Sequence, residues 1–412
     1  MLKKETARAL SFLLTFIFAV VFTAIFPFKN VILAATTADG SIDSTVIINK
    51  DTTNGPTLSV QDYYSMDSTN IGDLNGDGVD DIAVGAYRDD GAGTDQGAVH
   101  IHFMNTDGSI DSTVEINGST TNGPTLSNSD FYGIAVEGLG DLNGDGVEDI
   151  AVGAYLDDAD GANKGAVHIH FMNADGSIDS TVEINDSTAN GPTLTDNDMY
   201  GSAISLIGDL NGDGVDDLAV GAYSDDAGGT NRGAVHIHFM NTDGSIDSTV
   251  EINNTTANGA DIEDEEYYGI DVKNIGDLDG DGVNDLAVGA SANSTPTCPG
   301  QFFIHFMNTD GSIDSTVEID ENTTNGATLS NHDLYGYRIE NLGDWNNDGV
   351  NDLAVSAPYD DSGGENRGAF YIHYMNTDGS ISSTVEINSN TANGATLVDS
   401  ASYGASVTNI GD

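Results

Sequence analysis

Residues 140–154 read Gly-Asp-Leu-Asn-Gly-Asp-Gly-Val-Glu-Asp-Ile-Ala-Val-Gly-Ala, a loop of alternating oxygen-bearing side chains followed directly by a short apolar segment. The stretch recurs along the chain. Its first glycine is repeated with spacings of 68, 68, 68 and 67 residues, at Gly72, Gly140, Gly208, Gly276 and Gly343. Self-similarity at a fixed period indicates a repeat architecture in which each unit is one supersecondary element.

Each unit can be divided into four β-strands. In the second unit these are Tyr132–Val136, Ile150–Ala154, Ala166–Phe171 and Ser180–Ile184, rich in β-branched and aromatic residues. Asp175-Gly176 is a strong hairpin turn signal between the last two. No stretch after residue 35 shows a helical period of useful length. The sequence therefore predicts an all-β chain with four strands in every period.

A single four-stranded antiparallel sheet cannot bury its own two faces, whereas sheets stacked radially around an axis bury them against one another. We therefore expect a β-propeller of four-stranded blades, with about 68 residues per blade. The expected blades lie near residues 64–116, 132–184, 200–252, 268–319 and 335–387, with a truncated blade from residue 403.

The two ends of the repeat region suggest how the ring closes. Residues 38–48 copy the hairpin and the fourth strand of a blade. A stray outer strand of this kind usually pairs with strands from the C-terminal end, which would here lie beyond Asp412. A sixth copy of the motif begins at Gly411, and residues 36–412 amount to about 5.5 periods. We expect a propeller of the seven-bladed type, of which this sequence is a fragment.

The charge balance excludes several classes of partner. The chain has 67 acidic and 11 basic residues, a net charge of −56, and four of the basic residues precede the repeats. Nucleic acids and anionic lipid surfaces need a basic footprint, so both are poor partners. Cys298 is the single cysteine, which excludes a disulfide framework and a cysteine-based zinc cluster. The acidic excess instead indicates a demand for cations.

Residues 1–35 have the layout of a targeting segment. Lys3, Lys4 and Arg8 precede an apolar stretch from Ser11 to Phe28, as in a secretory signal peptide. Leu33-Ala34-Ala35 offers a mediocre cleavage site, and 18 residues are just long enough to span a bilayer, so an uncleaved anchor remains an alternative. Either way we expect residues 36–412 to be secreted or displayed at the cell surface.

The repeated loop has the ligand pattern of a calcium site. Alternate oxygen-bearing residues in a tight loop bring hard ligands to one side, and this ligand type suits Ca²⁺ far better than zinc or copper. The twelfth position, where an EF-hand needs a bidentate Glu, is a valine within a strand in all five copies. We expect about one Ca²⁺ per complete repeat, five in all, with each valine contributing its carbonyl oxygen: Asp73, Asn75, Asp77, Val79 and Asp81; Asp141, Asn143, Asp145, Val147 and Asp149; Asp209, Asn211, Asp213, Val215 and Asp217; Asp277, Asp279, Asp281, Val283 and Asp285; and Asp344, Asn346, Asp348, Val350 and Asp352.

These motifs together resemble the FG-GAP repeat of integrin α-subunit propellers. The "FG" element appears as Tyr132-Gly133 and its equivalents, and the "GAP" element as Gly153-Ala154-Tyr155, with the aspartate loop between them. The resemblance covers residues 36–412. It implies a propeller whose calcium ions lie in the loops between the first and second strands of each blade, on the face opposite the usual ligand face.

Other features fit packing or loop roles. The His-x-His pairs, such as His168 and His170, place two rings on one face of a strand, where we expect packing in preference to a metal ladder.

The acidic loops after the "GAP" element are of the kind that form recognition surfaces, although no ligand-binding residue can be named. The obvious break in the repeat, Ser291–Gly300, contains no acid or base, and no catalytic motif is present. We expect no enzyme activity.

Three functions are compatible with the sequence. The first is a calcium-stabilised extracellular propeller, similar to an integrin α head, that mediates adhesion or binds a protein or glycan. The second is a non-catalytic accessory propeller of a larger secreted hydrolase. The third is a structural component of a surface layer.

Overall fold

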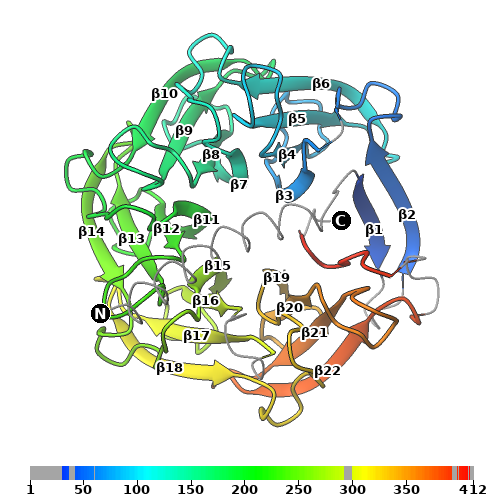
Figure 1. Ribbon diagram of the computed structural model, residues 1–412, viewed down its shortest axis with the longest axis vertical. Coiled ribbons are helices and arrows are strands. Elements are labelled where there is room, and N and C mark those ends of the chain that lie inside the picture. Colours follow the sequence, from blue (N-terminus) through cyan, green and yellow to red (C-terminus); the bar gives the residue numbers. More distant parts are fainter. Residues whose placement is uncertain are drawn as a thin grey trace, which may run out of the picture.

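The computed structural model describes residues 30–36, 42–59, 61–291, 299–391, 397, 399–406 and 408. The regular structure in this part of the chain is β-strand, with no helix. Five four-stranded antiparallel sheets are arranged around a common axis, so the chain is an all-β propeller with four-stranded blades, as the sequence predicts (Figure 1).

The four strands of each blade are consecutive in the chain and adjacent in the sheet, and the first of them lies nearest the axis. The blades are β3 (Tyr64–Asn70), β4 (Ile82–Ala86), β5 (Ala98–Met104) and β6 (Ile110–Asn117); β7 (Tyr132–Gly140), β8 (Asp149–Ala154), β9 (Ala166–Met172) and β10 (Ile178–Ile184); β11 (Tyr200–Gly208), β12 (Asp217–Ala222), β13 (Ala234–Met240) and β14 (Ile246–Ile252); β15 (Tyr268–Gly276), β16 (Asp285–Ala290), β17 (Gln301–Met307) and β18 (Ile313–Ile319); and β19 (Ile339–Gly343), β20 (Asp352–Ala357), β21 (Ala369–Met375) and β22 (Ile381–Ile387).

The middle strands of a blade are more buried than its outermost strand, because the neighbouring blades cover them. Every residue of the two middle strands of the second blade, β8 and β9, is buried, because neighbouring blades cover both faces of the sheet. The outermost strand β10 buries Ile178 and Ile184 and exposes Asp179 and Ser180. The apolar runs of the sequence thus become the middle strands, and the more polar run becomes the rim.

Adjacent blades are joined by backbone contacts at the start of the innermost strand. The amide of Tyr132 donates to the Gln96 carbonyl of the preceding blade at 2.9 Å. Equivalent bonds start from Tyr200, Tyr268 and Tyr335, and Tyr403 donates to Arg367 at 2.8 Å. This contact therefore fixes where each blade meets the one before it.

The glycine of the "GAP" element lies where two backbones approach closely. A Cβ atom added to Gly153 would lie 1.9 Å from the carbonyl oxygen of Gly201 in the next blade. Gly85 and Gly221 face the next blade at 1.9 and 2.1 Å in the same way. Because the obstructing atom is backbone, no side-chain rotation can make room for a methyl group.

We therefore predict that Gly153→Ala destabilises the chain by about 1–3 kcal/mol, the usual cost of overpacking a closely packed site. Denaturant unfolding in constant calcium measures the effect. Gly144→Asn is the matched control, since Asn347 already occupies the equivalent place in the fifth blade with φ 63°. Equal stability of the two variants would contradict the importance of this close approach.

The expectation of a seven-bladed type is not supported, because the chain shows five blades. The two-stranded sheet of β1 (Asn30–Thr36) and β2 (Ile42–Asn49) lies in the ring between the fifth blade and the first (Figure 1). The hydroxyls of Ser68 in β3 and Thr408 are 3.1 Å apart. This contact joins the first blade to the C-terminal segment.

The β2 strand lies where a blade would have its outer strand, as expected, but it does not pair with a strand from the C-terminal end. Asn54, just after β2, donates to the Asp111 carbonyl of β6 at 2.8 Å, as Asn122 donates to Asp179 one blade later. The strand pairs with β1 and not with a C-terminal strand. An outer strand needs a paired edge, and Asn30–Thr36 supplies it.

The predicted targeting segment lies mostly outside the described residues, which begin at Asn30. Its identification as a signal peptide or an anchor therefore remains a prediction. Within the described part of the chain, no helix has the length and apolar character needed to cross a membrane. The predicted break at Ser291–Gly300 also falls largely on residues that are not described.

Candidate metal centres

Five aspartate-rich loops connect the innermost strand of each blade to the second strand. In the second blade the loop runs from Asp141 to Asp149, between β7 and β8. Glycines at 144 and 146 adopt φ of 79° and 91°. These left-handed conformations, which favour glycine, turn the backbone sharply and leave the side chains of the alternate residues on the inside of the turn.

The side chains at the first, third and fifth positions hold the loop backbone. Asp141 accepts the amides of Asp145 and Gly146 through its two oxygens, each at 2.8 Å. Asn143 accepts the amide of Asp145 at 2.8 Å, and Asp145 accepts that of Val147 at 2.9 Å. The loops that begin at Asp73, Asp209 and Asp277 repeat this pattern.

The ninth-position aspartate is buried at the start of the second strand. Asp149 accepts the amides of Met172 at 3.0 Å and Leu142 at 3.1 Å, and its side chain is fully buried. Burial, the largest effect, raises the pKa of Asp149 to about 6, and the nearby Asp145 raises it further. Asp81 is equally buried, and its Oδ2 atom has no hydrogen-bond partner among the described residues. A cation in the loop would compensate such a buried carboxylate.

The fourth loop brings its carboxylates closest together. Asp277, Asp279 and Asp285 each place one carboxylate oxygen within 4.8 Å of the others. The remaining loops have asparagine in place of Asp279, which keeps an oxygen at that position with one negative charge fewer. Carboxylate and amide oxygens converging on one point form a donor set that Ca²⁺ accepts and softer metals do not. The geometry of the fourth loop therefore fits calcium, and the other four loops carry oxygen-bearing side chains at the same positions.

The fifth loop has Trp345 where the other loops have leucine, and it also lacks their first turn-forming glycine. Asn347 replaces the glycine found at positions 76, 144, 212 and 280 and adopts φ 63°, a conformation that asparagine tolerates. Asp344 still accepts the amides of Asp348 and Gly349 at 2.8 and 2.9 Å. The substitution thus preserves the turn.

The histidine pairs are packed inside the blades, with different roles for the two rings. His170 bonds to the hydroxyl of Tyr132 at 2.7 Å through Nε2 and to that of Thr181 at 2.7 Å through Nδ1. His168 is fully buried, and neither ring nitrogen has a hydrogen-bond partner among the described residues. Burial lowers the pKa of His168 to about 4, so the ring is neutral. The ring fills space, as Phe303 does at the same place in the fourth blade.

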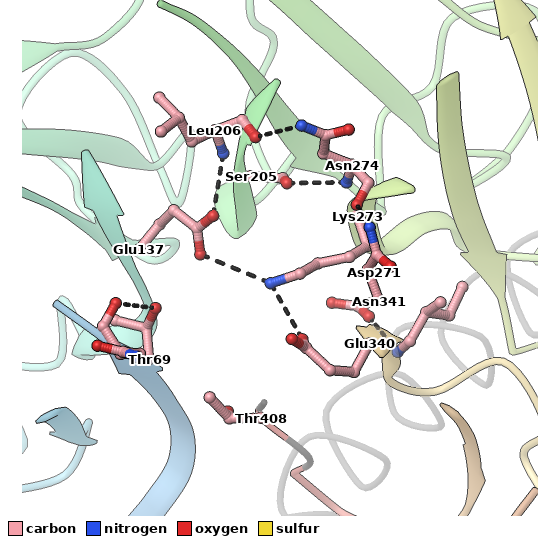
Figure 2. Close-up of polar contacts among 12 residues, drawn as sticks. Thr69, Glu137, Ser205, Leu206, Asp271, Lys273, Asn274, Glu340, Asn341 and Thr408 are labelled. Carbon is pink, nitrogen blue, oxygen red and sulfur yellow. Dashed lines mark hydrogen bonds and ion pairs between the residues drawn. The ribbon is translucent and has the colours of Figure 1, made fainter. Parts of the chain in front are cut away.

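A cluster of charged side chains lies at the axis, where the repeat breaks in a way that the sequence analysis missed. Lys273 of β15 lies between Glu137 of β7 and Glu340 of β19, with its Nζ atom 3.9 and 3.0 Å from their carboxylate oxygens (Figure 2). Asp271 and Arg338 belong to the same group and line the same small cavity. An alignment of the five innermost strands would have found the cluster. Glu137, Lys273 and Glu340 occupy the same position of the second, fourth and fifth blades, where the first and third blades have Thr69 and Ser205.

The axial side chains also join successive innermost strands. Asp67 accepts the amide of Val136 in the next blade at 2.8 Å, and Glu137 accepts that of Leu206 at 3.1 Å. Ser205 continues the pattern by accepting the amide of Asn274 at 3.0 Å (Figure 2). Backbone amides at the inner edges of these strands, which have no neighbouring strand, thereby gain hydrogen-bond acceptors.

Burial dominates the electrostatics of the axis. It raises the pKa of Glu137 to about 6 even though the nearby Lys273 lowers it. Burial alone would lower the pKa of Lys273, but Glu137 and Glu340 raise it well above its usual value. The cavity between these groups measures about 20 Å³, room for one water molecule and too small for a substrate. The cluster therefore holds blades together and does not form a reaction chamber.

Comparisons with known proteins agree with the motif. The FG-GAP repeat family matches residues 67–102, 135–170 and 200–238. Integrin alpha-4 of Xenopus laevis is 39% identical over 111 residues, which cover 26% of this chain and 10% of that protein. Integrin alpha-PS2 of Drosophila melanogaster is 29% identical over 205 residues, covering 49% and 13%. Integrin alpha-8 of Homo sapiens is 27% identical over 194 residues, covering 46% and 16%.

The matched region thus spans no more than 16% of the length of these three relatives. The solved structure of the Dos1 propeller is similar over 78% of this chain and 61% of that chain, with a TM-score of 0.38 and 12% identity. The sequence matches therefore place FG-GAP repeats in the first three blades and show that this chain is similar to part of the integrin alpha subunits.

Proposed function

We propose that this chain is an extracellular, calcium-binding propeller that mediates adhesion by binding a protein or a glycan. The observation that carries the proposal is the coincidence of FG-GAP repeats, similarity to integrin alpha subunits and five loops with the same pattern of oxygen-bearing residues, whose carboxylates converge in the fourth loop. Each loop would hold one Ca²⁺ through the first, third, fifth and ninth side chains and the seventh carbonyl. In the second blade these residues are Asp141, Asn143, Asp145, Asp149 and Val147.

The ions and the ligand would use opposite ends of the propeller. The aspartate loops join the end of each innermost strand to the start of the second strand. The connections that follow the second strand, such as the one after Ala154, lie at the other end of the blade and carry exposed acidic residues, including Asp158. Loops on a rigid scaffold are the usual location of binding residues. No catalytic role is proposed, because the buried charges at the axis enclose space for a single water.

Two measurements test the proposal. Metal analysis after dialysis against calcium is expected to give about five Ca²⁺ per chain, and Asp145→Ala is expected to lose one of them. A panel of immobilised matrix proteins and glycans, screened with and without calcium, is expected to contain a ligand whose binding needs the ion. A chain that binds no calcium, or that binds nothing in the panel, would remove the support for this function.

A further inference from the structure

A pair of aspartates is buried in each of four blades, at the end opposite the calcium loops. In the second blade Asp130 precedes β7 by two residues and Asp157 follows β8 by three, and their side chains are only 1% and 4% exposed. The corresponding pairs, all buried, are Asp62 and Asp89, Asp198 and Asp225, and Asp333 and Asp360. These aspartates belong to no calcium loop.

Each member of a pair uses one oxygen for its own loop. Asp130 accepts the amide of Ser127 through Oδ2, and Asp157 accepts the amide of Ala159 at 2.8 Å through Oδ1. The carboxyl groups of Asp130 and Asp157 are close enough to influence each other's pKa, and Oδ1 of Asp130 is buried with no hydrogen-bond partner among the described residues. Asp62 and Asp89 in the first blade, and Asp198 and Asp225 in the third, are neighbours in the same way.

The charges acting on the pair in the second blade are acidic, and the nearby guanidinium of Arg88 lies over the ring of Phe131 and is 3.7 Å from Asp95. The charged groups that face Asp130 are Asp157, Asp158 and Glu183, all acidic. Lys164, the single basic residue of this blade, is bound to Asp186 at 2.6 Å. An ionised carboxylate can only accept hydrogen bonds, and two like charges at this distance cannot both be ionised. A proton on one of the two carboxyl groups removes this repulsion and supplies the donor that the buried Oδ1 of Asp130 lacks.

We propose that the pairs in the first three blades each hold one proton at mildly acidic pH, shared between the two carboxyl groups, and that this proton joins the loop before the innermost strand to the loop after the second strand. This inference extends beyond calcium binding and adhesion. Burial, the largest effect, raises the pKa of Asp130 to about 7, and burial followed by the charge of Asp198 raises that of Asp225 to about 7. The ordinary aspartate pKa of the unfolded chain is about 3.9.

The sign of the pH dependence follows from these values. Between about pH 4 and pH 7 the folded chain binds a proton in each pair that the unfolded chain has released, so the folded state loses stability as the pH rises. The loop that each proton holds is strained: Ser129 and Phe131 adopt φ of 68° and 59°, in the left-handed region. Raising the pH through about 7 is therefore expected to loosen the loops of the proposed ligand face.

The other two blades avoid the shared proton in different ways. In the fifth blade the hydroxyl of Tyr371 donates to Oδ2 of Asp360 at 2.7 Å. This hydroxyl takes the place of the shared proton as the hydrogen-bond donor. In the fourth blade Glu266 stands at the place of Asp130, and the sequence has Asn293 where the second blade has Asp157. Neither a tyrosine hydroxyl nor an asparagine amide titrates near neutral pH.

The test is the double variant Asp130→Asn/Asp198→Asn, in which the amide group supplies the hydrogen that the proton supplies in the natural chain. Unfolding by denaturant is measured from pH 5 to pH 7 in constant, saturating calcium. Each pair should change the folding equilibrium constant by up to tenfold per pH unit, and the double variant should lose this dependence at two pairs. Asp158→Asn/Asp226→Asn is the control, because it removes two exposed carboxylates next to the same pairs.

Infrared spectroscopy provides a second measurement on the natural chain. The carbonyl stretch of protonated carboxyl groups should be present in the folded chain at pH 6, disappear on unfolding and weaken in the double variant. Its absence from the folded natural chain would refute the proposal even if the variant fails to fold. Equal pH dependence of the variant and the control would also overturn it. A loss of bound calcium in Asp130→Asn/Asp198→Asn would show that a cation, and not a proton, occupies the pairs.

Discussion

Removing calcium is expected to lower the melting temperature more than any single substitution. An ion that binds only the folded state contributes about 2.7 kcal/mol per site at a hundredfold excess over its dissociation constant, so five sites would contribute about 13 kcal/mol. That sum is comparable with the whole stability of a typical protein. Loss of the ions also leaves buried carboxylates such as Asp149 beside other acidic groups.

Circular dichroism melting curves in calcium and in excess chelator measure this effect. A chelator already saturated with calcium is the control for the reagent itself, and returning calcium to the stripped chain should restore the original curve. Magnesium should restore little, because it demands a smaller and more rigid octahedral site. A melting curve that does not respond to the chelator would contradict structural calcium in the aspartate loops.

Replacing the axial lysine should have the largest effect among the substitutions. Lys273→Met leaves Glu137 and Glu340 without the cation that lies between them. Removing one partner of a buried ion pair typically costs 3–5 kcal/mol, because the remaining charge is buried without compensation. The cost should be smaller at acid pH, because burial raises the pKa of Glu137 to about 6 and its protonation removes one of the uncompensated charges.

Denaturant unfolding of Lys273→Met in constant calcium measures the loss. The matched control is Lys50→Met, which breaks the exposed ion pair between Lys50 and Asp51 and should change stability by no more than about 0.5 kcal/mol. Adding Glu137→Gln and Glu340→Gln to Lys273→Met should recover part of the lost stability, since no unpaired charge then remains. If the two lysine variants proved equally stable, the axial cluster would have no role in holding the blades together.

The sequence by itself determined the local structure of this chain. Four apolar runs in each 68-residue period became four strands, because their spacing and composition suit a sheet buried on both faces. The aspartate loops could be predicted for the same reason, since alternate oxygen-bearing residues and glycines act within ten residues of one another. The turn at Asn347 follows from the same local chemistry.

Contacts between blades were decided only by the tertiary structure. The sequence predicted the five complete blades, but the number of blades in a ring depends on how far each sheet turns relative to the next, which no single period encodes, and the expected seven-bladed type is not supported. A glycine is needed at position 153 because the carbonyl group of Gly201, 48 residues later, leaves no room for a side chain. The charged group around Lys273 brings together strands that lie 68 or more residues apart. The buried pair of Asp130 and Asp157 exists because two loops of one blade meet, and its shared proton follows from burial, a property that the sequence does not display.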